Sequence, residues 1–181
     1  MIQHFNNRSS SVYVASIDAS KAFDRVNHYK LFSILIKKGL PSYFVHTLHN
    51  WYSRLNVKIK WQNSLSSPMM VLSGVRQGGV LSGHLFNLYV NDLLTSLRNK
   101  DLGCHLDNMF IGALMYADDL ILLSSSIYEL QTMLDICDKI GNELEIKFNP
   151  VISICMALIG PNCYNDLSHL ILGNVPKKCR R

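Results

Sequence analysis

The sequence contains no cysteine pair with the spacing of a metal site or a disulfide framework. Its five cysteines are odd in number, are scattered along the second half of the chain and form no C-x-x-C motif. Zinc ribbons, redox motifs and disulfide-rich secreted folds depend on such spacing. The sequence therefore predicts reduced, mostly buried thiols at Cys104, Cys137, Cys155, Cys163 and Cys179.

Long hydrophobic runs are also missing. The longest uncharged apolar run covers about nine residues, from Met109 to Ala117, whereas a helix that spans a bilayer needs about 20. The start of the chain has no basic segment followed by an apolar one, which is the pattern of a secretory signal. We therefore expect an intracellular protein of the cytoplasm or nucleus, without a membrane partner.

Charged residues are scarce and slightly more often basic than acidic. They make up 17% of the 181 residues, against 48% hydrophobic residues, and the formal net charge is +5 at pH 7. This composition excludes a disordered chain and is typical of one globular domain with a sizeable core. The positive charge permits a nucleic-acid partner but does not demonstrate one.

Hydrophobic periodicity predicts alternating strands and helices, and so a layered α+β (or α/β) domain. The expected strands cover residues 10–18, 109–117 and 151–160, and the expected helices cover 28–39, 41–53, 80–98 and 127–144. Gly39 is expected to end the first of these helices, and Asp107 with Asn108 to form a tight turn before the strand 109–117. Residues 54–61 alternate strictly between apolar and polar, which predicts a half-buried strand paired with residues 68–73. Ser126 and Glu129 have the spacing of a capping box at the start of the last helix.

Asp118 and Asp119 interrupt an apolar stretch that reads ALMYADDLILLSS. Adjacent carboxylates in an apolar setting repel each other and lose hydration, so they require raised pKa values or a compensating cation. The flanking segments predict a hairpin with both aspartates at its tip. If the strand that ends at Asp18 lies beside this hairpin, a carboxylate cluster suited to Mg²⁺ and phosphoryl transfer results. The alternative is a solvated turn, the usual role of an isolated Asp-Asp pair.

Three segments, in this order, resemble the reverse transcriptases of non-LTR (LINE-like) retrotransposons. The family's motif A is similar to SIDASKAFDRVNH (16–28), and its motif B is similar to SGVRQGGVLSGHLFNLYVNDL (73–93). Its motif C, with a YADD core, is similar to LMYADDLILLS (114–124), and residues 130–160 resemble motif D. The resemblance covers about residues 10–160.

The resemblance implies a polymerase palm, an antiparallel sheet with helices packed on one face and a metal site at the sheet surface. It implies an RNA-directed DNA polymerase, with an RNA template, a DNA primer and dNTPs as partners. Asp18, Asp118 and Asp119 would hold two Mg²⁺ ions, with Mn²⁺ as an alternative. One ion would activate the primer 3′-hydroxyl, and the other would hold the triphosphate and stabilise the leaving pyrophosphate.

The same resemblance assigns nucleotide contacts. Phe23 falls at the family's steric gate, where a bulky ring would crowd a ribose 2′-hydroxyl; the alternative is a core aromatic. Gln77 and Gly78 match the motif B turn that contacts the incoming nucleotide and the template. The backbone of Ala19 or Ser20 would meet the triphosphate.

Other residues near these motifs receive weaker assignments. Tyr116 would lie near the primer end, unless it is an ordinary strand aromatic. Asp24 and His28 fit the motif A pattern but are given no catalytic role. Lys58 and Lys60 could contact a phosphate backbone or simply face solvent.

The sequence departs from the family in two motifs. Motif D usually carries a lysine shortly after its asparagine, as a proton donor to pyrophosphate, whereas NPVIS (149–153) has Ile152 there. Loss of a positioned general acid typically costs about 10²–10⁴-fold in rate. Motif B usually reads LSP, and Gly83 in place of that proline is expected to weaken the helix start.

The length of the chain also departs from the family. Only 17 residues precede Asp18 and about 20 follow motif D, so we expect a partial palm at 1–160, a tail at 161–181 that leads toward the primer grip and thumb, and fingers and thumb largely missing. Three functions stay open: a truncated polymerase that is weak or inactive alone, an inactive retroelement relic that still binds nucleic acid, and, ranked lower, a nucleotidyl cyclase-like palm enzyme.

Overall fold

A computed structural model describes residues 10–158, 169–172 and 175–178 of the chain. The chain divides into two compact units, one formed by Met1–Lys21 with Val90–Arg181 and the other by Ala22–Tyr89. The division falls within the helix α4 (Ser82–Asn99). The predicted boundary at residue 160 lies outside the described residues.

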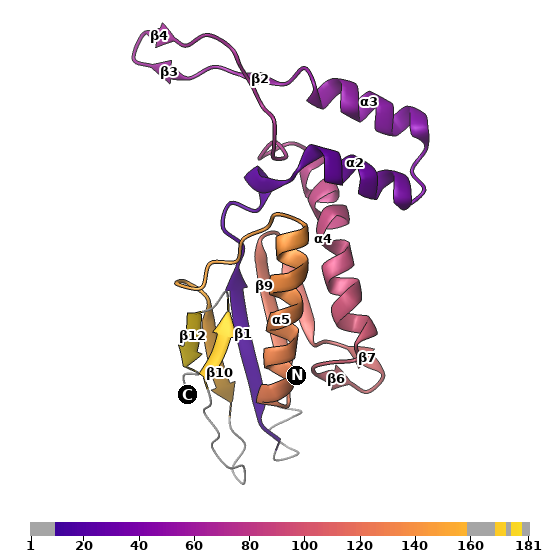
Figure 1. Ribbon diagram of the computed structural model, residues 1–181, viewed down its shortest axis with the longest axis vertical. Coiled ribbons are helices and arrows are strands. Elements are labelled where there is room, and N and C mark those ends of the chain that lie inside the picture. Colours follow the sequence, from indigo (N-terminus) through magenta and orange to yellow (C-terminus); the bar gives the residue numbers. More distant parts are fainter. Residues whose placement is uncertain (1–9, 159–168, 173–174, 179–181) are drawn as a thin grey trace. The chain divides into compact units, whose positions relative to one another are not determined.

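The first unit is built on a four-stranded antiparallel sheet with the strand order β10-β1-β9-β8 (Figure 1). Its strands are β1 (Val12–Asp18), β8 (Ala113–Tyr116), β9 (Asp119–Ser124) and β10 (Ile154–Leu158). β1 is rich in β-branched and aromatic residues, which favour a strand, and it pairs with both β9 and β10. The sheet confirms the predicted strand 10–18 and places it centrally.

One long helix, α5 (Ile127–Glu143), contacts β1 and β9 and covers this sheet (Figure 1). Its apolar side chains recur at helical spacing and join residues of the sheet in one core. A second hairpin, β11 (His169–Leu172) with β12 (Val175–Lys178), contacts α5 and β10. Its Leu170 and Leu172 are each 2% exposed and belong to the same core.

The N-terminus of α5 differs from the predicted capping box. The helix begins at Ile127 as expected, but the Ser126 side chain makes no capping hydrogen bond. Instead the Ser124 hydroxyl donates to the Glu129 carboxylate at 2.7 Å and accepts from the Ser126 N–H at 3.1 Å. The prediction that the Ser126 hydroxyl caps the helix was therefore wrong. The hydroxyl of Ser124, the buried last residue of β9, makes the bonds at this end of the helix instead.

The predicted strand at 109–117 is divided in two. Residues before and after Gly112 form β7 (Met109–Phe110), which pairs with β6 (His105–Leu106), and β8. A Cβ at Gly112 would lie 2.8 Å from the Phe110 ring and 3.0 Å from the Leu102 carbonyl oxygen. The bend at this position therefore requires glycine, which has no Cβ. Asp107, with φ of 51°, forms the predicted tight turn.

The second unit begins with a helical pair. A short 3-10 helix, η1 (Phe23–Arg25), leads into α2 (His28–Lys37), and α3 (Ser42–Tyr52) contacts α2. The Asn27 side chain caps α2 by accepting from the Lys30 N–H at 3.2 Å. Beyond Lys37, Gly39 adopts a φ of 79°, which ends the helix at the predicted place.

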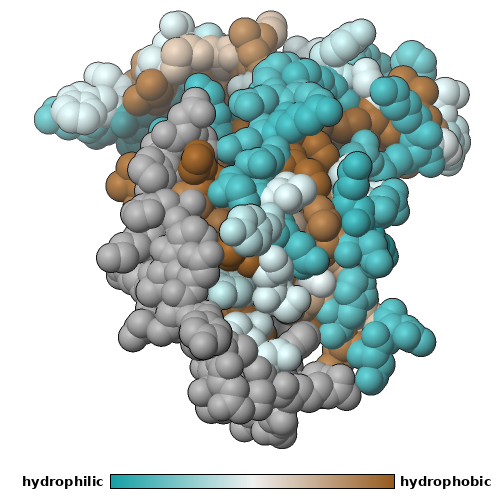
Figure 2. Space-filling view, turned by 60° about the horizontal axis from the view of Figure 1, so that its bottom comes forward, coloured by the Kyte–Doolittle hydropathy of each residue, from teal (hydrophilic) through white to brown (hydrophobic). Residues whose placement is uncertain are grey.

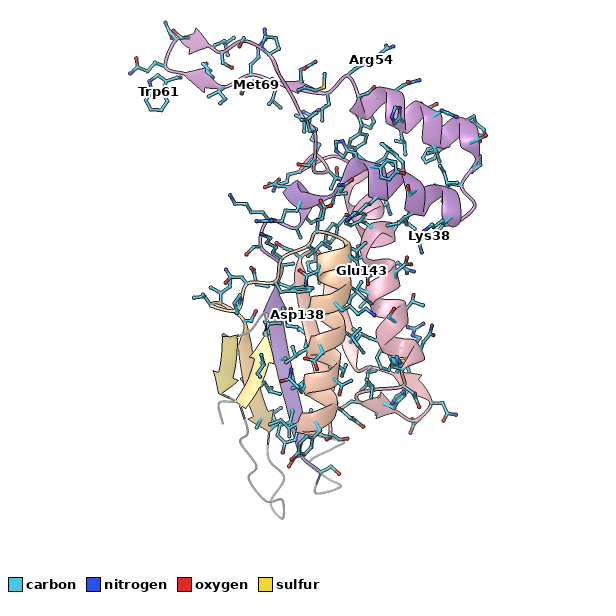
Figure 3. The ribbon with its side chains drawn as sticks, viewed as in Figure 1. Lys38, Arg54, Trp61, Met69, Asp138 and Glu143 are labelled. Carbon is cyan, nitrogen blue, oxygen red and sulfur yellow. The ribbon has the colours of Figure 1, made fainter. Side chains whose placement is uncertain are left out.

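Residues 54–72 form a thin two-stranded projection, which we call the arm (Figures 1 and 3). Its strands are β2 (Asn56–Val57), β3 (Lys60–Trp61), β4 (Ser64–Leu65) and β5 (Met69–Met70), with β2 paired to β5 and β3 to β4. The predicted pairing with residues 68–73 is confirmed for β2 alone, because β3 pairs with β4 instead. The predicted half-burial is wrong. Val57 is 48% and Trp61 76% exposed because no described layer of this unit covers either face.

Other sequence expectations concern thiols and membranes. Cys104, Cys137 and Cys155 are buried, as predicted, and burial raises the pKa of the Cys104 thiol to about 11. Cys163 and Cys179 lie outside the described residues. No helix in the described part of the chain is long and apolar enough to cross a bilayer. On the face in Figure 2, apolar side chains reach the surface between hydrophilic ones.

The two faces of β9 give a direct test of the core. Leu122 is fully buried and Ile121 is 37% exposed. We expect Leu122→Ala to lower the free energy of unfolding by about 2–5 kcal/mol, because it leaves a cavity in the core. Ile121→Ala is expected to cost about 1 kcal/mol, chiefly from strand propensity. Urea denaturation of both variants measures the difference, and equal losses would contradict the described sheet.

Candidate functional site

Three aspartates lie near one another where β1 ends and β9 begins. Asp18 is the last residue of β1, Asp119 is the first residue of β9, and the two are direct partners in the antiparallel register. Asp118 lies in the turn between β8 and β9, and its carbonyl oxygen accepts from the Ala19 N–H at 3.2 Å. The structure thus confirms the predicted convergence, with Asp119 rather than Asp118 as the register partner of Asp18.

The turn that carries Asp118 is as short as a hairpin allows. Tyr116 and Asp119 are register partners, so only Ala117 and Asp118 connect the strands. Ala117 has a φ of 52°, at a hairpin position where glycine is usual. The tight turn puts both aspartates at the end of the sheet, as the sequence predicted, instead of within its buried centre.

The motif D-like segment is fastened to the same end of β1. The Asn149 N–H donates to the Asp18 carbonyl oxygen at 2.8 Å, and the Asp18 N–H donates to the Ser153 hydroxyl at 3.4 Å. Ile152, which stands where the family usually has lysine, is 53% exposed. The backbone of this segment is therefore bonded to the end of β1, whereas the Ile152 side chain has no proton to donate.

Burial and the repulsion between like charges both act on the carboxylate cluster. Asp18 and Asp118 are half-buried and Asp119 is exposed. Burial, followed by the negative charges of Asp118 and Asp119, raises the pKa of Asp18. No described lysine or arginine forms an ion pair with the three, and within the described residues no three acidic, histidine or cysteine side chains are arranged as a metal cage. An all-oxygen donor set that lacks a compensating cation fits a hard divalent ion.

The residues around this cluster are placed as follows. Ala19 is fully buried, and its N–H is used by Asp118. The Ser20 N–H donates to the Lys147 carbonyl oxygen at 2.9 Å. A triphosphate could therefore bind these two N–H groups only by displacing existing bonds. Tyr116 is 86% exposed beside Asp119, so it is not a packing residue of the described sheet.

Three of the predicted nucleotide contacts, Phe23, Gln77 and Gly78, belong to the second unit. Phe23 is half-buried and stacks on Phe86, with ring centroids 4.5 Å apart. Gln77 and Gly78 are exposed in a loop ahead of α4, and Gly78 has a φ of 77°. The Gln77 amide donates to the Asp24 carboxylate at 3.4 Å.

Two hollows flank this loop. One, of about 300 Å³, is lined by Trp51, Tyr52, Arg76, Gln77 and Gly78 among others. The other, of about 520 Å³, includes Asp24, Asn56, Gly74 and Gln77. Gln77 borders both hollows and is thus accessible to a ligand from either side.

Sequence reasoning missed a segregation of charge along the chain. Between Asp24 and Asp92 there is no acidic residue at all. The second unit consequently carries eight basic side chains against the single carboxylate of Asp24: Arg25, Lys30, Lys37, Lys38, Arg54, Lys58, Lys60 and Arg76. A count of charge by segment instead of over the whole chain would have found this signal.

The sequence model of the family described as "Reverse transcriptase (RNA-dependent DNA polymerase)" matches residues 2–151. The chain belongs to this reverse transcriptase family. This assignment confirms the predicted resemblance to reverse transcriptases and favours it over the nucleotidyl cyclase alternative.

Relatives with this domain are retrotransposon proteins. The chain is 33% identical over 135 residues to the Pol polyprotein of the type-2 retrotransposable element R2DM of Drosophila melanogaster, covering 75% of this chain and 13% of the relative. It is 37% identical over 133 residues to the 149 kDa protein of transposon TX1 of Xenopus laevis, covering 71% of this chain and 10% of the relative. The chain thus spans only a small part of these proteins.

A solved structure shares the fold. Apo telomerase from Candida tropicalis, truncated from its C-terminal domain, matches with a TM-score of 0.63 and 16% identity, covering 98% of this chain and 37% of that one. At this identity the likeness shows the fold alone. It agrees with the predicted α+β palm.

The raised pKa of Asp18 predicts a pH dependence of stability. The folded chain holds this proton more tightly than the unfolded chain, whose carboxyl has the ordinary value of 3.8. The contribution of Asp18 to stability is therefore complete below that value and is lost as the pH rises through the raised pKa. We expect Asp18→Asn to remove this loss and to be more stable than the parent at pH 7.

Urea denaturation in the presence of a chelator, across about pH 4 to pH 7, measures this effect. Asp107→Asn, in an exposed turn, is the matched control and should follow the parent. If Asp18→Asn were less stable than the parent at pH 7, the raised pKa of Asp18 would be contradicted.

Proposed function

We propose that the chain is the palm portion of an RNA-directed DNA polymerase, which adds deoxynucleotides to a primer 3′-hydroxyl by two-metal nucleotidyl transfer. The observation that carries the proposal is the register pairing of Asp18 with Asp119, with Asp118 in the adjoining turn. In a member of the reverse transcriptase family, three carboxylates so arranged are the expected ligands of divalent cations.

Asp18, Asp118 and Asp119 would hold Mg²⁺, or Mn²⁺ in its place. When bound, such ions polarise the attacking hydroxyl and stabilise the leaving pyrophosphate. The three side chains supply the negative charge that recruits the ions, since their mutual repulsion is otherwise uncompensated. Removal of one carboxylate should therefore weaken ion binding while it relieves strain in the ion-free protein.

Phe23, Gln77 and Gly78 would select and hold the nucleotide. The stacking of Phe23 on Phe86 restrains the ring, which suits a gate that acts by steric exclusion of a 2′-hydroxyl. The exposed Gln77 amide and the flexible backbone at Gly78 suit contact with base or sugar. Tyr116, which is exposed next to Asp119, would contact the primer end.

The template and primer would bind partly through the basic second unit. Its charge excess favours a polyanion, because each neutralised phosphate releases counterions. Arg54, Lys58 and Lys60 are exposed on the arm. Trp61, which lies at the end of the arm away from Arg54 (Figure 3), is also exposed and offers an aromatic face on which a base could stack. The arm is thus our candidate contact for nucleic acid.

A second candidate is an inactive relic that retains nucleic-acid binding. Ile152 favours it, because this exposed side chain cannot donate a proton to pyrophosphate. The two candidates predict the same nucleic-acid binding and differ only in turnover. Restoring the lysine by Ile152→Lys would separate them, since it should raise the rate of a slow polymerase and leave a relic silent.

Substitution of one carboxylate tests the polymerase proposal. We expect the parent to extend a DNA primer on an RNA template with dNTPs and Mg²⁺, and Asp118→Asn to abolish extension while leaving the fold intact. The isosteric amide keeps the turn but removes a charged ligand. Primer extension on gels and circular dichroism measure the two properties, and Asp107→Asn serves as control. Equal turnover by Asp118→Asn and the parent would refute the metal assignment.

Charge removal on the arm tests the nucleic-acid contact. We expect the double variant Lys58→Gln with Lys60→Gln to bind single-stranded RNA more weakly and to reduce the slope of log affinity against log salt by about 1.4. The variant Lys37→Gln with Lys38→Gln removes the same charge at the end of α2 and should change the slope less. Fluorescence anisotropy across salt concentrations measures both. Equal slopes for the two variants would exclude the arm.

A further inference from the structure

The motif B loop, residues 73–79, is fastened to the segment 23–28 within the second unit. The Gly74 N–H donates to the Val26 carbonyl oxygen and the Val75 N–H to the Phe23 carbonyl oxygen, both at 2.8 Å. Asn27 and Ser73 form an isolated antiparallel bridge. The loop that carries Gln77 and the residue proposed as the steric gate are thus joined by backbone bonds.

The shortest of these connections comes from a side chain. His28 Nε2 lies 2.7 Å from the carbonyl oxygen of Gly74. Because a carbonyl oxygen can only accept, Nε2 carries the proton in this bond. The ring is half-buried and meets Tyr52 edge-on, with centroids 4.8 Å apart and an interplanar angle of 75°. Packing against a buried tyrosine restrains the ring and so keeps the donor aimed at Gly74.

A residue with a side chain cannot replace Gly74 at this contact without strain. Gly74 is buried, has a φ of 90°, and a Cβ there would lie 3.0 Å from the Cα and carbonyl oxygen of Asp24. Its carbonyl would be an unsatisfied buried acceptor without His28 or water. The peptide after Gly74 is therefore oriented by the His28 donor, and this peptide begins the exposed stretch that presents Gln77.

We propose that His28 is a positioning residue, which holds the motif B loop in the conformation that presents Gln77 and Gly78 to the incoming nucleotide. The inference rests on the proposed function for its nucleotide, although the geometry stands by itself. The bond from Gln77 to Asp24 is longer, at 3.4 Å, and exposed, so it restrains the loop less.

The first test needs no activity. Hydrogen exchange at the amides of Gly74 and Val75, and the rate of tryptic cleavage after exposed Arg76, are compared in the intact chain. His28→Leu should raise both several-fold, whereas His28→Gln, whose amide reaches as far as Nε2, should keep both near the parent. His46→Leu, at an exposed position of α3, is the matched control. Unchanged exchange and cleavage in His28→Leu would overturn the proposal.

If His28→Leu does not fold, His28→Asn takes its place, because its shorter amide cannot reach the Gly74 carbonyl. In that case protection in His28→Gln together with exposure in His28→Asn supports the proposal. Equal protection in the two variants would overturn it.

The second test separates positioning from chemistry. In primer extension, His28→Leu should raise the KM for dNTP about tenfold and leave kcat within about twofold of the parent, with His28→Gln restoring KM. A fall in kcat without a change in KM would overturn the link to the nucleotide. A parent chain that extends no primer would overturn the proposed function instead, and the exchange result would still decide whether His28 holds the loop.

Discussion

The antiparallel register between β1 and β9 is the constraint on which the site depends. It sets Asp18 opposite Asp119 and leaves a two-residue turn for Asp118. A slip of one residue would exchange the two faces of β9, exposing Leu122 and burying the charged end of the sheet. The buried alternation of Leu120 and Leu122 against α5 prevents that slip. Core packing thus fixes the geometry of three mutually repelling carboxylates.

Repulsion among these carboxylates and the excess of positive charge elsewhere have a common consequence. The carboxylate cluster lies in one unit, while the segment between Asp24 and Asp92 has only basic charges. Like charges repel one another within each region, so each region favours a ligand of the opposite charge. The carboxylates favour cations, and the basic segment favours phosphates. This segregation is the electrostatic basis for expecting a complex of protein, divalent ions and nucleic acid.

The sequence predicted local features well where one residue type determines the geometry. Gly39 ends α2, Asp107 forms a turn, and the aspartate pair occupies a hairpin tip. It failed at the start of α5, where the Ser124 hydroxyl bonds both the Glu129 carboxylate and the Ser126 N–H, so that the expected capping box does not form. Strict alternation in residues 54–61 predicted one strand where the structure has the two short strands β2 and β3, and periodicity alone cannot reveal whether a second layer covers them. The resemblance located the carboxylates. It could not reveal the contact of His28 with Gly74, which depends on how the chain folds.

The central claim is that the register-paired aspartates and the adjoining turn form one cation site. The most direct measurement is a titration of the isotope-labelled chain with Mn²⁺, followed by paramagnetic broadening of its amide NMR signals. The account predicts that the signals of Asp18, Ala19, Asp118 and Asp119 broaden first, that excess Mg²⁺ reverses the effect, and that Asp118→Asn weakens it. Broadening that begins elsewhere, or that is unchanged in Asp118→Asn, would contradict the account.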